Sequence, residues 1–242
     1  MWLMVKTLDL FYLLMLSIVF SGVLIPVFAS ENFQKNIEFE SPQIFSTLSN
    51  TMSNVSFDGK WSFGQEWKES TLNQFGNDAF PMILRIAHFD DFLYVHVNNL
   101  FDLTNNKSAD RTIVCLSPIH SNPENDYFCF VASRGINSGH TLEGNAQSYF
   151  DGNLKLILNP PDFIGIGGTS SIGDRYMVTP HAAYEFKIPL DFVGKSHDYR
   201  FLIKTVDRDT VYTFPEHLMK SSNGIPSMDY WGILSSKDKT MG

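Results

Sequence analysis

The sequence predicts an all-β protein, an antiparallel β-sandwich of the immunoglobulin or jelly-roll kind with long loops. Apolar and polar residues alternate with a period of two, and clusters of Asn, Asp, Gly and Pro separate the alternating runs. No long segment has the 3.6-residue period of an amphipathic helix. The 21 Phe among 242 residues fit a thick apolar core between two sheets.

Residues 1–29 are interpreted as a signal peptide. Lys6 precedes an apolar run over 11–28, and Val27-Phe28-Ala29 has the small-residue pattern that signal peptidase reads. Cleavage before Ser30 predicts a protein that is secreted or held at the cell surface. An uncleaved membrane anchor is the alternative, because the run nearly has the length that spans a bilayer. If the leader is cleaved, the mature chain has no membrane-spanning segment.

The rest of the chain is expected to contain a polar lead-in over 30–52 and a single sandwich domain over 53–242. A short helical turn is expected near 66–74, and the segments 134–153 and 159–182 are expected to be long loops. Gly165 to Gly173 is interpreted as a flexible part of the second loop, since no helix follows it to complete a phosphate site. Strands are expected at about 54–58, 82–88, 92–98, 111–117, 127–133, 154–158, 183–188, 199–206, 210–214 and 230–235.

Alternation along two of these strands predicts which side chains face the core. Leu93 and Val95 share one face, so His96 is expected on the other face, half exposed. Tyr184 and its alternating apolar neighbours likewise place Glu185 on the outward face of its strand.

The two cysteines, Cys115 and Cys129, each lie in a predicted strand, on either side of a loop-forming segment. An antiparallel hairpin centred on Asn122 brings them face to face, and an exported chain favours a disulfide between them. Two buried free thiols are the alternative.

Charge and motifs exclude several function classes. The chain has 26 acidic and 18 basic residues and a formal net charge of -8, so it has no basic stripe for nucleic acid. It lacks the Gly-x-Ser-x-Gly elbow and the His-Glu-x-x-His metal motif, and we expect no enzyme. Glu66 and Glu185 form a carboxylate pair for glycoside cleavage only in a minority interpretation.

A series of landmarks in a fixed order carries a family resemblance. They are Phe57-Asp58-Gly59-Lys60-Trp61, Glu66-Trp67, Phe92 to Val97, Asp110 to Val114, Tyr184 to Asp191, and Trp231 to Leu234. In order and spacing they resemble the family 9 carbohydrate-binding-module-like β-sandwich, a relative of the haem- and sugar-binding DOMON domains. The resemblance implies an exported, non-catalytic protein whose partner is a carbohydrate. A haem-binding electron-transfer domain and a purely structural cell-surface protein are the alternatives.

The resemblance also directs attention to candidate ligand residues. Tyr149 and Phe150 are expected to present aromatic faces to sugar rings from the first long loop. Met177 and His181, in the second, are candidates for the same ligand site and, with Met82 and His88, for axial haem ligands. Trp67 and Trp231 are expected to be buried and structural.

Calcium is the one metal that the resemblance implies, as a structural ion held by loop carboxylates. Asp90, Asp91 and Asp102 lie in or near predicted turns and are the candidate ligands. Their spacing does not resemble a calcium-binding loop, so the favoured interpretation is that they are carboxylates of solvated turns. Apart from calcium and the haem alternative, no cofactor is expected.

Overall fold

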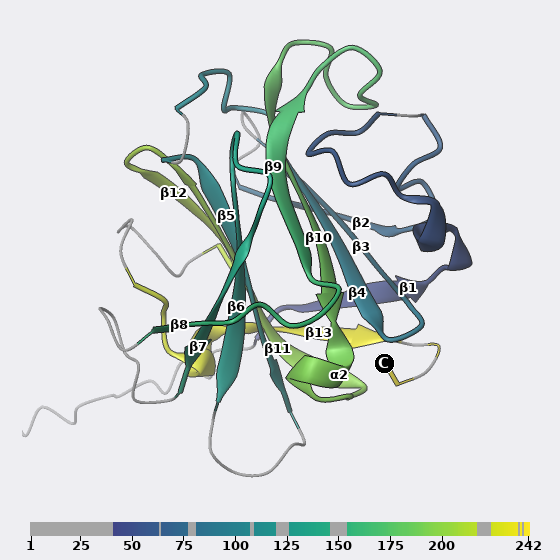
Figure 1. Cartoon of the computed structure of the whole chain (residues 1–242), viewed down its shortest axis with the longest axis vertical. Helices are drawn as coiled ribbons and strands as arrows, with labels where there is room; N and C mark the ends of the chain where they lie inside the picture. The colour runs from purple at the N-terminus through teal and green to yellow at the C-terminus, as the bar shows by residue number, and fades with distance from the viewer. Residues whose placement is uncertain are drawn as a thin grey trace, which may run out of the picture. The chain divides into compact units, whose positions relative to one another are not determined.

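A computed structural model describes residues 41–242 apart from 63, 77–80, 107–108, 120–125, 146–153, 217–223, 237 and 239. It confirms the β-sandwich, with strands β5 to β8 on the left of Figure 1 and β2, β3 and β4 on the right. The predicted signal peptide and the residues Tyr149 and Phe150 lie outside the described residues. Within the described part of the chain, no helix has the length and apolar character needed to cross a membrane.

Two groups of strands make the two layers. Sheet A runs in the order β8 (Lys155–Ile157), β7 (His140–Gly144), β6 (Tyr127–Ser133), β5 (Arg111–Pro118) and β11 (Asp198–Asp207), with β12 (Thr210–Phe214) and β13 (Gly232–Ser236) both beside β11. Sheet B consists of β2 (Thr71–Phe75), β3 (Met82–Phe89), β4 (Phe92–Asn99), β10 (His181–Pro189) and β9 (Ile164–Ser170). All pairings within the two sheets are antiparallel among the described strands.

Strand β1 (Gln43–Leu48) joins the two sheets. Its first residues pair in parallel with β13, and Thr47 and Leu48 pair in parallel with β3. The short helices are η1 (Asn50–Asn54), α2 (Leu190–Val193) and η2 (Met228–Tyr230).

The main core lies between the inner faces of the two sheets. Leu84, Val95 and Tyr184 from sheet B pack with residues such as Phe130 and Phe201 from sheet A. The alternation that predicted these strands is the cause, because successive side chains of a strand point to opposite faces. Trp67 and Trp231 are both fully buried, as the sequence predicts.

The predicted disulfide joins Cys115 and Cys129. The two residues are direct partners in the antiparallel pairing of β5 with β6, with Cα atoms 4.0 Å apart. The bond lies on the outer side of sheet A, in a second apolar cluster that also holds Trp231.

Several boundaries differ from the sequence prediction. The polar lead-in expected over 30–52 contains β1 and most of η1, so the domain begins earlier than 53. Residues 55–58 form no strand, and the turn expected near 66–74 gives way to β2 at Thr71. The two predicted loops contain β7 and β9.

Strand β9 was not predicted because its glycines carry no alternating side-chain pattern. The role of these glycines is to allow close packing. A Cβ on Gly167 would lie 2.7 Å from the carbonyl of Ser133, and one on Gly168 would lie 2.5 Å from the oxygen of Gly59. The glycines therefore allow other backbones to approach β9 closely, while β9 keeps its full pairing with β10.

Sheet B is buried on both faces, which a period-two pattern does not reveal. Residues of 52–67 and Tyr176 pack over its outer side, where Met52, Trp61 and Trp67 cover Tyr94. His96 and Glu185 point to this outer side, as the alternation predicts, and both contact Trp67. The covering residues leave neither any exposed surface, so the exposure predicted for His96 was wrong.

Candidate functional site

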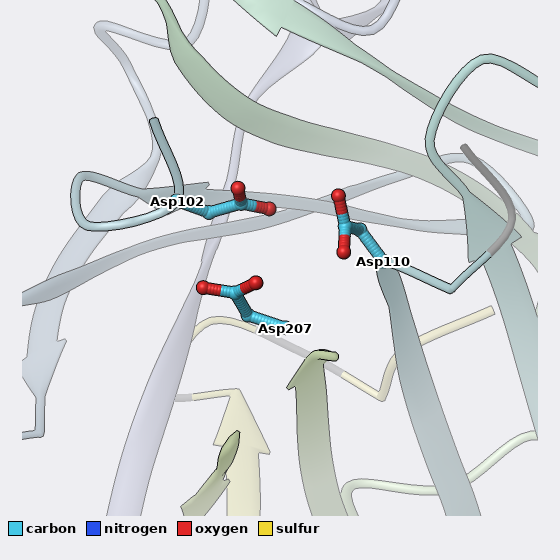
Figure 2. Close-up of side chains that lie close together, drawn as sticks. All are labelled: Asp102, Asp110 and Asp207. Atoms are coloured by element: carbon cyan, nitrogen blue, oxygen red, sulfur yellow. The ribbon is translucent and has the colours of Figure 1, made fainter. Parts of the chain in front are cut away.

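Three carboxylates meet at one end of the sandwich and form what we call the acidic centre: Asp102, Asp110 and Asp207. Each offers an oxygen that lies within 4.8 Å of the others, and Figure 2 shows the three groups turned toward one common space. Asp102 follows β4 in sheet B, Asp110 directly precedes β5, and Asp207 ends β11 in sheet A. Asp102 and Asp110 are buried, and Asp207 is partly exposed.

Arg134 is the buried cation beside this centre. Its Nη1 lies 3.0 Å from Asp102 Oδ1 and 3.8 Å from Asp110 Oδ2, and the side chain is 2% exposed. The guanidinium also donates to Thr169 on β9, which fixes its position. One buried positive charge therefore faces three acidic groups, and the exposed Arg208 acts on Asp207 from outside.

Burial and mutual repulsion disfavour the charged forms of these acids. Burial raises the pKa of Asp102 to about 7, although Arg134 opposes the change, and the neighbouring Asp207 and Asp110 add to it. Burial, followed by Asp110, also raises the pKa of Asp207.

Sequence reasoning found one member of the acidic centre. Asp102 was a predicted calcium ligand, but Asp90 and Asp91 precede β4 whereas Asp102 follows it, so the strand separates them. Asp91 instead pairs with Lys195 at 2.6 Å on the surface. Asp90 and Asp91 are therefore not part of the acidic centre. Asp110 and Asp207 were missed because only the fold brings them beside Asp102.

A second buried acidic group, on the outer side of sheet B, is held quite differently. Glu185 Oε2 accepts hydrogen bonds from the backbone N–H groups of Asp58 and Gly59, at 2.9 and 2.7 Å, and Oε1 accepts one from Trp67 Nε1 at 3.0 Å. Gly59 has a φ of 74°, a conformation that glycine adopts without strain. Burial raises the pKa of Glu185 to about 8, against the opposing effect of the bonds from Gly59 and Trp67.

Glu185 therefore anchors the segment that covers sheet B. Its partner in the minority catalytic interpretation, Glu66, accepts from the backbone N–H groups of Ser56 and Ser62 and has the same structural use. Both carboxyl groups therefore hold the covering segment in place through hydrogen bonds to its backbone.

Asp174 anchors the loop that contains Met177. Its oxygens accept from Asn98 Nδ2 and Ser170 Oγ, and from the backbone N–H groups of Tyr176 and Met177. Burial alone would raise the pKa of Asp174, but the hydrogen bonds from His181, Ser170, Tyr176 and Asn98 outweigh it and hold the pKa well below its ordinary value.

His181 does not lie on a surface loop as the sequence suggested. It begins β10, is fully buried, and has Nδ1 2.7 Å from the carbonyl oxygen of Thr179 and Nε2 3.4 Å from Asp174 Oδ2. Both ring nitrogens face protein oxygens, so this residue does not fit an axial haem ligand or a sugar contact. Met177 is partly buried in the loop held by Asp174.

Two adjoining hollows open on the surface of the segment 47–69, and together we call them the double hollow. Their volumes are about 330 and 570 Å³, and both include Thr51 and Glu69. The polar side chains around them that are exposed are Asn50, Thr51, Asn54, Gln65 and Glu69. Apolar side chains contribute too, namely Leu48, Val55 and Phe89.

Comparison with known proteins gives a likeness of structure. No protein-family model and no curated protein matches the chain. The structure is similar to that of a family 9 carbohydrate-binding module from Caldicellulosiruptor kristjanssonii in complex with cellotriose, with a TM-score of 0.45, 10% identity, and coverage of 81% of this chain and 94% of that chain. It is also similar to such a module from the same organism in complex with glucose, with a TM-score of 0.43, 10% identity, and coverage of 81% and 96%.

Proposed function

We propose that this protein is an exported, non-catalytic β-sandwich that binds a glycan at the double hollow. The observation that carries the proposal is the combination of size and chemistry at this surface. The volumes lie near the lower part of the range of about 300–1,000 Å³ that is usual for small-molecule sites. Two hollows that share a wall can hold neighbouring units of one oligosaccharide.

The side chains of the double hollow suit sugar hydroxyl groups. Asn54 and Gln65 supply amides that donate and accept, Glu69 supplies a carboxylate that accepts, and Thr51 supplies a hydroxyl group. Val55 and Phe89 supply apolar surface for the C–H faces of a sugar ring.

The rigid support beneath the hollow favours a binding site over a loop that merely covers the sheet. Trp67 lies below it, fully buried and bonded to Glu185, and Glu66 holds the backbone at Ser56 and Ser62. A preorganised surface loses less conformational entropy when a ligand binds. The predicted contributions of Tyr149 and Phe150 stay predictions.

The test is a binding experiment with Glu69→Gln, because Glu69 borders both hollows and is exposed. Asn54-Val55-Ser56 is a glycosylation sequon, so the chain is produced in a host that adds no N-glycan to the hollow. A glycan array, with cellotriose and glucose among its probes, identifies the best sugar, and calorimetry measures its affinity. We expect Glu69→Gln to weaken binding by about tenfold or more, since a hydrogen bond to a charged group contributes about 1.5–3 kcal/mol.

The matched control is Asp209→Asn, which removes one exposed carboxylate in the turn between β11 and β12. It should bind the sugar as the wild type does. The proposal is contradicted if no sugar binds, or if Glu69→Gln binds the best sugar as tightly as the control.

A further inference from the structure

The acidic centre contains buried carboxylate oxygens that have no hydrogen-bond partner among the described residues. Arg134 contacts Asp102 Oδ1, but no described residue bonds to Asp102 Oδ2. The backbone N–H of Asn106 donates to Asp110 Oδ2 at 2.8 Å, but no described residue bonds to Asp110 Oδ1. Each side chain is therefore oriented through one oxygen and presents the other. Because most buried polar atoms in proteins are hydrogen-bonded, such orphans require an explanation.

A third buried group points to the same explanation. Tyr184 lies on the inner face of β10, is fully buried, and its hydroxyl has no hydrogen-bond partner among the described residues. Its pKa is raised well above the ordinary value, first by burial and then by Asp102 and Asp110, so the hydroxyl lies within electrostatic reach of both carboxylates. This residue comes from the core and not from the acidic loops, yet it too is left unpaired near the centre.

The formal charges at the acidic centre also leave negative charge uncompensated. Three ionised carboxylates and the buried guanidinium of Arg134 sum to a charge of minus two, and two of the carboxylates are buried. Arg208, the other cation that acts on Asp207, is exposed to solvent. Uncompensated buried charge is strongly unfavourable, so the group either takes up protons or binds a cation. A single divalent ion restores neutrality.

We propose that Asp102, Asp110 and Asp207 bind one calcium ion through the oxygens that face their common space. The ligand set consists of oxygens, which hard cations prefer, and the acidic centre offers no thiol or imidazole. Oxygens within 4.8 Å of one another suit metal–oxygen distances of about 2.3–2.6 Å. Magnesium usually takes one or two carboxylates and keeps several waters, which fits three protein carboxylates less well.

Such an ion would fasten the two layers of the sandwich together. Asp102 lies just after β4 of sheet B, whereas Asp110 directly precedes β5 and Asp207 ends β11, both in sheet A. The backbone carbonyl of Asp102 also accepts from Ala182 of β10, so the site is coupled to the strand that carries Tyr184. The ion acts on stability at this end of the fold, independently of the sugar surface.

The experiment uses the full chain after removal of metal with EDTA, and titrates it with calcium chloride by calorimetry at neutral pH. We expect one ion per chain. The variant Asp207→Asn should weaken binding by at least roughly tenfold, because even outer partners of metal ligands contribute about 10–100-fold. Asp207 is chosen because it is partly exposed and has no ion pair with Arg134, so its replacement disturbs the fold least. Asp209→Asn, two residues away, is the control and should bind as the wild type does.

Terbium provides a second readout that needs no variant. Bound at the acidic centre, it should show emission sensitised by Tyr184, and calcium chloride should abolish that emission by displacing it. The proposal is overturned if the wild type binds no calcium and sensitises no terbium emission. It is also overturned if Asp207→Asn and Asp209→Asn weaken binding equally, or if magnesium binds more tightly than calcium.

Discussion

The two buried acidic regions of this protein differ in how their charge is met. On the outer side of sheet B, both oxygens of Glu185 and both oxygens of Asp174 accept hydrogen bonds from the covering segments. At the acidic centre, Asp102 and Asp110 each keep one oxygen to which no described residue bonds. A carboxylate whose oxygens are filled by protein donors organises the chain around it, whereas one that keeps a free oxygen is available to a ligand.

Because of this difference, the contributions of the two regions to folding stability depend on pH in opposite directions. The pKa of Asp174 lies below its unfolded value, so its contribution to stability is present above about pH 4 and is lost in stronger acid. The pKa of Asp102 is raised from 3.8 to about 7, so without a cation the folded chain holds a proton that the unfolded chain releases. Its contribution therefore falls as pH rises from about 4 to 7.

The largest expected effect on stability comes from disrupting the outer side of sheet B, where Glu185 and Asp174 are fully hydrogen-bonded. Trp67→Ala disrupts it most directly. The change removes a fully buried ring and also the donor to Glu185 Oε1. We expect the free energy of unfolding, measured by urea denaturation, to fall by about 3–5 kcal/mol. Leu158→Ala, at a residue 90% exposed, should change it by less than about 0.5 kcal/mol. A loss for Trp67→Ala no larger than that of Leu158→Ala would show that the covering segment contributes little to the fold.

Replacing Asp174 with Asn tests whether its hydrogen bonds carry the loop that covers sheet B. The variant keeps the shape but loses one acceptor and the charge, and an amide then faces donors such as Asn98 Nδ2 and Ser170 Oγ. We expect a loss of about 2–3 kcal/mol in the free energy of unfolding. Asp209→Asn serves again as the exposed control, and equal stability of the two variants would contradict the structural role of Asp174.

Calcium should stabilise the protein through the acidic centre by a smaller amount, and this stabilisation should depend on pH. With free calcium at about ten times its dissociation constant, binding adds about 1.4 kcal/mol to the stability of the folded state. Protons compete for Asp102, whose pKa is about 7, so the rise in melting temperature should be small at about pH 5 and larger at about pH 8. Melting curves with and without calcium at the two pH values measure it. A rise that is the same at both pH values would mean that calcium binds elsewhere.

The sequence predicts the part of this fold that depends on local alternation. Strands β3, β4, β5 and β10 were found because each places apolar residues on one face at every second position. Strand β9 was missed because its glycines carry no side-chain pattern, although they are there to admit the backbones of Ser133 and Gly59. The burial of His96 and Glu185 could not be predicted either, since it depends on a segment more than twenty residues away in the chain.

The candidate sites show the same limit. The disulfide was predictable because Cys115 and Cys129 belong to one hairpin. The acidic centre was not, because Asp102 and Asp110 lie near the two ends of the connection between β4 and β5, and Asp207 ends the distant strand β11. Asp102 was noticed because it lies near a turn, as do Asp90 and Asp91, which the structure places at the other end of β4.

The most direct test of the contrast is an anomalous difference map from crystals of the protein grown with calcium chloride, recorded at a wavelength where calcium scatters anomalously. The account predicts one strong peak between Asp102, Asp110 and Asp207, at about 2.3–2.6 Å from their oxygens, and none beside Glu185 or Asp174. An acidic centre with well-defined side chains and no peak, or a comparable peak beside Glu185, would contradict it.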